Sequence, residues 1–184
     1  MTRYLLSLLV VAFALTGVSA FAQTPPPHST LFYNNGIVYI DSSVTVQITG
    51  NTITTGPLSV FHNDGAVYVH FDTLFPSAAK GFTLDNDAVV NGNGYYEIEP
   101  DWTNNSISFN SGESHVNLMS DVEQLITGTQ VSNFNILELR GDGIGTNRKK
   151  RMTINVNVYD SLSLNNRELA TDSFVLSVQN TEST

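Results

Sequence analysis

The chain has 184 residues, no cysteine and a formal net charge of −9, from 17 acidic and 8 basic side chains. The absence of Cys excludes a disulfide scaffold, a thiolate metal site and a cysteine nucleophile. The acidic balance argues against nucleic acid as a partner, because a nucleic-acid binder needs a basic footprint. The 19 Asn, 19 Thr and 18 Ser, with 13 Gly, are typical of turns and short strands. A hydrophobic content of 41 % is too high for a disordered tail.

The first 22 residues predict a secretory signal peptide. Arg3 supplies the positive charge, Leu5 to Leu15 form an apolar run broken only by Ser7, and Ala20-Phe21-Ala22 ends in small residues. The run is shorter than the ~20 apolar residues that a membrane-spanning helix needs. We expect cleavage after Ala22, which leaves no membrane span and a secreted or outer-surface protein; an uncleaved anchor is the alternative. Residues 23–30, with three consecutive prolines, predict an extended spacer.

A repeat follows the spacer. Residues 32–40 and 61–69 share Phe, Asn, Gly, Val and Tyr at an offset of 29, and residues 90–98 form a weaker third copy. Each copy is a turn with Asn-Gly or Asp-Gly character followed by an alternating strand. This spacing predicts that Gly36, Gly65 and Gly94 are equivalent, that the strands after them lie side by side and parallel, and that Val38, Val67 and Tyr96 stack. Asn34 is expected to lie over Asn63.

Further short runs, which alternate apolar residues with Asn, Ser or Thr, continue to the end of the chain. Examples are residues 44–48, 116–118, 136–139, 154–158 and 175–178. Brief strands between turn residues indicate an all-β fold, and a repeat of this length indicates a solenoid. We therefore expect residues 31–184 to form one right-handed parallel β-helix with a ~29-residue repeat in its first half. The alternative is a β-sandwich, in which the repeat is a duplicated hairpin.

Three segments resemble the N-terminal β-solenoid regions of large secreted, adhesin-like surface proteins of Bacteroidota-type bacteria. They are the end of the predicted signal peptide, Ala-Phe-Ala-Gln, the Phe-x-Asn-x-Gly-x-Val-Tyr motif, and the segment Val131 to Leu139 with the Asn/Thr-rich sequence that follows it. The resemblance implies surface display and names no activity. Many such proteins carry a C-terminal sorting domain, whereas this sequence ends at Asn180 to Thr184 without one. It is therefore either a natural short form or the front of a longer protein.

Four acidic and aromatic residues are candidates for a sugar site. Glu97 and Glu99 flank Ile98 in a predicted strand, so their carboxylates lie on one face about 7 Å apart. Inverting glycosidases use a separation in this range. Asp101 and the single tryptophan, Trp102, follow directly and could bind a sugar ring. The alternative is a solvated strand face, with Trp102 covering the edge of the core.

Two charged segments remain. Asp85 and Asp87 offer alternating oxygen ligands that could begin a calcium loop, but Ala88-Val89-Val90 departs from the EF-hand pattern. No other cofactor is indicated. Arg148, Lys149, Lys150 and Arg151 form a basic run that we expect on a loop before the strand that starts at Met152. This run is a candidate for contact with an anionic polysaccharide or surface or for proteolytic processing; otherwise it is a solvated hairpin tip.

The function expected from these features is structural or adhesive: an exported solenoid whose Asn/Thr/Ser-rich faces contact glycans or surface proteins. The alternative is a carbohydrate-active enzyme or carbohydrate-binding module that uses the Glu97–Trp102 segment. Only six residues follow the run Phe174 to Val178, which is too few for a polar cap on a final coil. We therefore expect an open edge there that frays or supports self-association.

Overall fold

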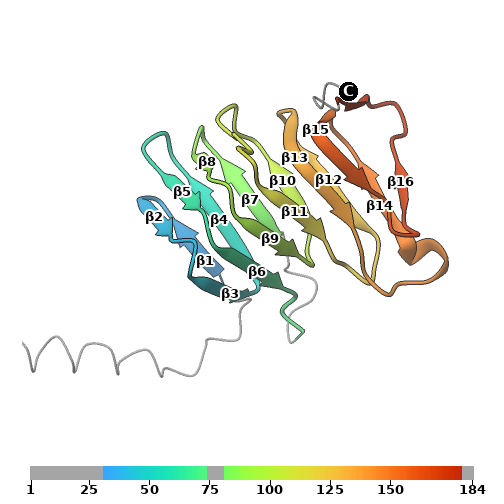
Figure 1. The fold of residues 1–184 in the computed structure, drawn as a ribbon, viewed down its shortest axis with the longest axis horizontal. Helices are drawn as coiled ribbons and strands as arrows, with labels where there is room; N and C mark the ends of the chain where they lie inside the picture. The colour runs from blue at the N-terminus through green and yellow to red at the C-terminus, as the bar shows by residue number, and fades with distance from the viewer. Residues whose placement is uncertain (1–30, 74–80, 180–184) are drawn as a thin grey trace, which may run out of the picture.

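The structure, a computed structural model, describes residues 31–73 and 81–179 and is a parallel β-solenoid of about six turns with roughly 23 residues per turn. The coils stack along one axis, from blue at one end to red at the other in Figure 1. Every pair of neighbouring strands is parallel, which confirms the solenoid and overturns the sandwich alternative. The predicted signal peptide and the spacer at residues 23–30 lie outside the described residues.

Three parallel sheets form the sides of the solenoid. Sheet A contains β1 (Leu31–Asn34), β4 (Asn51–Thr55), β7 (Phe82–Asp85), β10 (Trp102–Asn104), β12 (Gln124–Gly128), β14 (Lys149–Met152) and β16 (Glu168–Ala170). Sheet B contains β2 (Ile37–Ile40), β5 (Val60–Asn63) and β8 (Val89–Asn91). Sheet C contains β3 (Thr45–Thr49), β6 (Ala66–His70), β9 (Tyr95–Ile98), β11 (His115–Leu118), β13 (Ser132–Leu139), β15 (Val156–Ser163) and β17 (Leu176–Val178). We number the coils 1 to 7 by their strand in sheet A.

The coils change shape along the axis. Coils 1 to 3 have three sides, and sheet B ends at β8, where Val90 makes a last isolated parallel bridge to Phe109 of coil 4. The strands of coils 5 to 7 belong only to sheets A and C. One short 3₁₀ helix, η3 (Gly145–Arg148), precedes β14. Within the described residues, no helix is long and apolar enough to cross a bilayer.

The core follows from strand alternation, because every second side chain of a strand points inward. In β9, for example, Tyr96 and Ile98 are buried, whereas Tyr95 and Glu97 remain partly exposed. Phenyl and indole rings stack along the solenoid interior: the ring centroids of Phe82 and Trp102 lie 5.2 Å apart. Further ring contacts link Phe32, Phe61, Phe109 and Phe134 into the same core.

The 29-residue repeat is correct for its second and third copies and wrong for its first. Val67 pairs with Tyr96 in sheet C, as predicted. The partner of Val67 in coil 1 is Val46, however, while Val38 pairs with Phe61 in sheet B. The first copy therefore spans the corner between sheets A and B, whereas the second spans the corner between sheets B and C.

The shared motif reflects a common corner rather than a common position. Asn34 Oδ1 accepts the backbone N–H of Gly36, and Asn63 Oδ1 accepts that of Gly65, both at 3.0 Å. Each amide nitrogen then donates to a carbonyl of the next coil, of Val60 and of Tyr95 respectively. The expected stacking of Asn34 on Asn63 does not occur, because the two lie at different corners: Asn34 is opposite Thr54 in sheet A, and Asn63 is opposite Ile40 in sheet B.

The two ends of the described solenoid are edges. Strands β1, β2 and β3 are terminal in their sheets at one end, and β16 and β17 at the other. In β17, Leu176 packs against the core and Val178 is 49 % exposed. The edge position predicted for this segment is thus observed within the described residues, while fraying and self-association there stay predictions.

Candidate functional site

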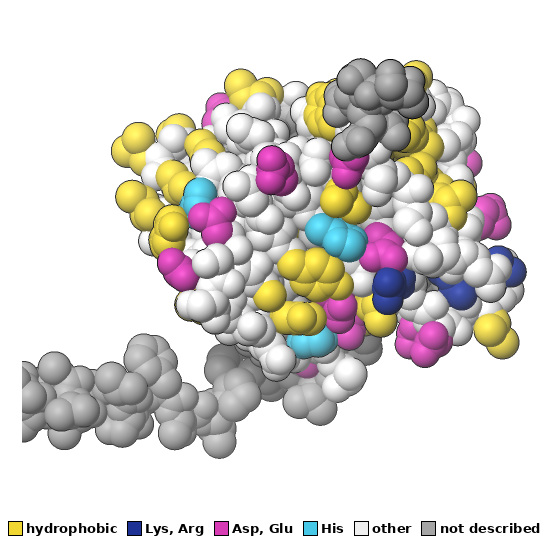
Figure 2. Space-filling model, in the orientation of Figure 1, with side chains coloured by type: hydrophobic (Ala, Val, Ile, Leu, Met, Phe, Trp, Pro, Cys, Tyr) yellow, Lys and Arg dark blue, Asp and Glu magenta, His cyan; other side chains and the backbone are white. Residues whose placement is uncertain are grey.

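A group of aromatic, histidine and carboxylate side chains gathers on the outer surface of sheet C. We call it the sheet C patch, and it comprises Tyr68, His70, Tyr95, Glu97, Glu99, His115, Asn117 and Glu138. Strand pairing places these residues in adjacent columns: Tyr95 lies opposite His115, and Tyr68 opposite Glu97. In Figure 2, histidine, acidic and hydrophobic side chains come together in the middle of this face.

The rings of the patch follow the solenoid axis. The Tyr68 and Tyr95 centroids are 6.0 Å apart, and the Tyr95 and His115 centroids are 5.2 Å apart in an edge-to-face arrangement. The Tyr68 and His70 rings are nearly parallel at 6.4 Å. Three successive coils therefore present partly exposed rings that touch one another, with Tyr68 in the column beside that of Tyr95 and His115.

Carboxylates alternate with these rings. Glu97 accepts the Tyr95 hydroxyl at 2.9 Å, and Glu99 accepts the backbone N–H of Phe71 at 2.8 Å beside His70 Nδ1 at 3.0 Å. Burial and the bond to Glu97 raise the pKa of Tyr95, so its hydroxyl stays protonated and can donate. Glu97 lies in β9 and Glu99 directly after it, and both are partly exposed while Ile98 between them is buried, as predicted for a shared face.

Asn117 is the one patch residue that its neighbours cover completely, and it is 1 % exposed. Its Nδ2 donates to the Tyr95 hydroxyl at 3.1 Å, but its Oδ1 has no hydrogen-bond partner in the described part of the chain. A buried polar atom without a partner costs free energy. The patch therefore contains a buried acceptor that the described residues leave unsatisfied.

Glu138 closes the patch towards coil 6. One carboxylate oxygen lies 3.0 Å from His115 Nε2, and the other accepts from Arg140 at 2.8 Å and from Asn165 at 2.7 Å. The pKa of Glu138 is lowered: burial acts to raise it but is outweighed by the Arg140 and Asn165 hydrogen bonds and the charges of Arg140 and His115. Its carboxylate is therefore held ionised.

The remaining sugar-site candidates lie inside the solenoid or at its corner. Trp102 is fully buried in the core, and its indole nitrogen donates to Ser132 Oγ at 3.0 Å. Its ring therefore offers no surface for a sugar. Asp101 accepts the backbone N–H of Leu125, and burial raises its pKa. Neither side chain is part of the sheet C patch.

The basic run is not a loop. Lys149 to Arg151 lie in β14, where alternation buries Lys150 at 0 % exposure. Arg151 is paired with Glu123 and Asp172, and Arg148 donates to Asn166. The loop prediction is therefore wrong for Lys149 to Arg151, which belong to β14, while Arg148 lies before the strand in η3. Contact of the run with an anionic polysaccharide or surface and its proteolytic processing stay predictions.

Asp85 begins a tight turn and Asp87 is one of its two central residues. Asn86 and Asp87 have positive φ, and the backbone N–H of Ala88 bonds to the Asp85 carbonyl at 3.1 Å, as in a two-residue hairpin-type turn. The described residues contain no group of three or more His, Cys, Asp or Glu side chains that could hold a metal ion. Calcium also accepts amide and backbone carbonyl oxygens, so calcium binding at Asp85 and Asp87 stays a prediction.

A second histidine cluster ties coils 1 to 3 together on sheet B. His62 lies between Asp64 and Asn91, with both ring nitrogens 2.7 Å from an oxygen, and Tyr39 stacks on the ring at 4.7 Å. Two acceptors favour the imidazolium form, which has two N–H donors. The hydrogen bond to Asp64 outweighs burial and raises the pKa of His62, whereas that of Asp64 is lowered.

We expect the NMR titration of His62 to have its midpoint above the ordinary value of 6.5. Since the folded pKa is raised, this pair stabilises the fold fully below pH 6.5, and the contribution is lost as the pH rises through the folded pKa. Asp64→Asn should move the midpoint down, while Asp41→Asn, which alters a neighbouring turn, should not. A wild-type midpoint at or below 6.5 would contradict the assignment.

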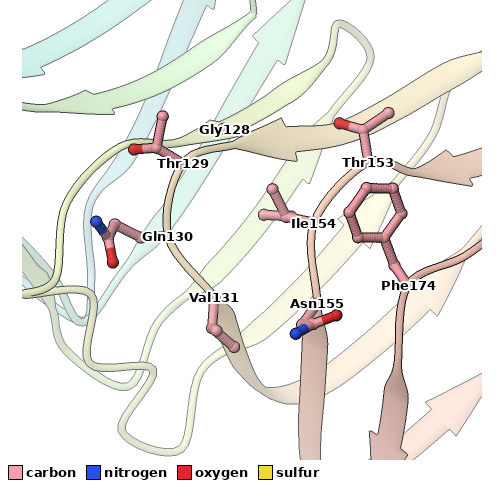
Figure 3. Close-up of a pocket in the computed structure, with 8 residues that line it drawn as sticks. All are labelled: Gly128, Thr129, Gln130, Val131, Thr153, Ile154, Asn155 and Phe174. Carbon is pink, nitrogen blue, oxygen red and sulfur yellow. The ribbon is translucent and has the colours of Figure 1, made fainter.

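Hollows in the described part of the solenoid include two that are lined by successive coils. The first, of about 300 Å³, lies between sheets A and C at coils 5 to 7. In Figure 3 the ring of Phe174 lies beside Ile154 and Thr153, and Gly128 to Val131 form the opposite wall. The second, which we call the arginine groove, has a volume of about 420 Å³ and is lined by Met119, Arg140, Gly141, Asp142, Asn165 and Arg167.

Comparison with known proteins adds no assignment to this geometry: no protein-family model matches the chain, and no curated protein or solved structure is significantly similar to it. The sequence reasoning found Glu97 and Glu99 but missed the tyrosines and histidines beside them. The signal was present, because His70 and Glu99 are separated by the same 29 residues as Val67 and Tyr96. If the alignment of the second and third copies is extended by one residue beyond the repeat, to His70 and Glu99, it places these two side chains next to each other.

Proposed function

We propose that this protein is an exported structural or adhesive solenoid that contacts glycans through the sheet C patch. The observation that carries the proposal is the group of partly exposed Tyr and His rings, in two adjacent columns of sheet C, interleaved with carboxylates. Aromatic faces pack on the apolar faces of sugar rings, while carboxylates and amides hydrogen-bond to sugar hydroxyls. The signal-peptide pattern at residues 1–22 supports export, and the repeated coils support an extended contact surface.

A flat sheet favours an extended ligand over a small molecule enclosed in a pocket. Ring centroids 5.2–6.0 Å apart on successive coils suit neighbouring sugar residues of a polysaccharide that runs along the solenoid axis. Each coil adds one weak contact, so affinity depends on several subsites together. The proposal therefore favours oligosaccharides over monosaccharides.

Glycan-array binding followed by calorimetry tests this function. Tyr95→Ala removes the central ring and should weaken oligosaccharide binding about tenfold or more, as expected for an aromatic hot spot. Tyr33→Ala is the matched control, because Tyr33 is 57 % exposed and lies on sheet A. Equal binding by both variants, or no binding by the wild type, would contradict the proposal. Release of reducing ends that Glu97→Gln abolishes would instead identify a carbohydrate-active enzyme.

A further inference from the structure

The arginine groove joins the sheet C patch directly. Its lining residues Arg140 and Asn165 both donate to Glu138 Oε1, whose second oxygen lies beside His115 in the patch. Met119 follows β11 in the same part of the sheet. A glycan chain lying along the rings of the patch would therefore reach the groove at coils 4 to 6.

Two guanidinium groups border this groove in an otherwise acidic protein. The side chain of Arg140 is 52 % exposed, and its pairing with Glu138 uses one amino group. Arg167 donates from one amino group to the carbonyl of Gly143 at 2.6 Å, while its buried Nε has no partner among the described residues. Since a guanidinium has five donor N–H groups, both arginines retain donors for which residues 31–73 and 81–179 provide no hydrogen-bond partner.

We propose that the arginine groove binds the carboxylate of an acidic sugar, so that the glycan contacted by the patch contains uronic acid. This inference rests on the proposed function and specifies its ligand class. A planar guanidinium matches a carboxylate through paired, charge-assisted hydrogen bonds. Bringing two like charges to one groove is also less costly when an anion lies between them.

Acidic groups in and beside the groove set the selectivity. Asp142 lines the groove, and its backbone N–H bonds to the Asp121 carboxylate. Glu138 already neutralises part of the Arg140 charge. The two arginines are thus opposed by three carboxylates, so the groove offers directed N–H donors rather than a positive field, which suits single carboxylates spaced along a glycan.

The test compares oligogalacturonate with the same oligomers after reduction of their carboxyl groups to neutral galactose units, using calorimetry on the full chain. The acidic oligomers should bind about tenfold more tightly, as expected when charge-assisted hydrogen bonds form. Arg140→Gln and Arg167→Gln should each remove the preference, and Asp142→Asn should strengthen acidic binding. Arg151→Gln is the matched control, because Arg151 is paired elsewhere with Glu123.

The outcomes separate the two proposals. Equal affinity for acidic and neutral oligomers, unchanged in the Arg140 and Arg167 variants, overturns the uronate inference and leaves the patch as a neutral-glycan surface. If Arg151→Gln also lost the preference for acidic oligomers, that preference would come from the overall charge of the protein, and this result would likewise overturn the inference. Unchanged binding of both oligomers in Tyr95→Ala overturns the proposed function of the patch.

Discussion

Trp102→Ala should lower the free energy of unfolding by about 3–5 kcal/mol, the range for removing a large buried aromatic side chain. The indole is fully buried and contacts Phe82, Phe109 and Phe134, with ring centroids 5.1–5.2 Å away. Its loss leaves a cavity at the centre of the aromatic stack and removes the donor that satisfies Ser132. Urea denaturation followed by circular dichroism would measure the change.

Tyr33→Ala is the control, because it also removes a large aromatic side chain but from an exposed position. The free energy of unfolding of this surface variant should remain within about 0.5 kcal/mol of the wild-type value. If Trp102→Ala lowered the free energy of unfolding no more than Tyr33→Ala does, the aromatic stack would not be the centre of the core.

The strand pattern of this solenoid could be predicted from the sequence, but the coil length could not. Alternation fixes which side chains face inward, so Ile98 is correctly placed between two outward carboxylates. Coil length varies because each corner can hold a different number of residues: Val67 pairs with Val46 on one side and with Tyr96 on the other. The same Asn-x-Gly chemistry serves two different corners, so the first two copies of the motif looked equivalent and were not.

The site was only partly predictable for a related reason. Glu97 and Glu99 were identified from local spacing, which needs no knowledge of neighbouring coils. For Trp102 the sequence left two interpretations open, a sugar platform or a cover for the edge of the core, and its place opposite the buried Phe82 and Ile126 in sheet A puts it inside. The basic run was misplaced because hydrophilic residues suggested a loop, whereas Lys150 is in phase with the buried Met152 of β14.

Lys150 leads to the second large expected effect, a change in how stability depends on pH. Its ammonium is buried and donates to the Ser120 carbonyl at 2.8 Å and to Gln124 Oε1 at 2.9 Å. Burial, together with the charge of Arg167, lowers the pKa of Lys150 from 10.5 to about 8, although the Asp121 carboxylate acts in the opposite direction. The fold therefore disfavours the charged form of this side chain.

Between pH 8 and 10.5 the unfolded chain binds the Lys150 proton more strongly than the folded protein does. Stability should therefore rise with pH across this window through Lys150, by up to about 3 kcal/mol. Lys150→Met should abolish this rise. At pH 7 the variant should gain stability, but by less than that amount, because Ser120 and Gln124 lose a donor.

Urea titrations at pH 7 and pH 10 on the wild type, Lys150→Met and Lys149→Met would measure this effect. Burial also raises the pKa of Tyr96, which favours unfolding at high pH, but this contribution is common to all three proteins and cancels in their differences. Lys149 is the matched control, since it is adjacent, partly exposed and paired only with Glu168 at 3.7 Å in the described structure. A Lys150→Met variant with the wild-type pH dependence would show that the buried ammonium is fully compensated by its hydrogen bonds and by Asp121.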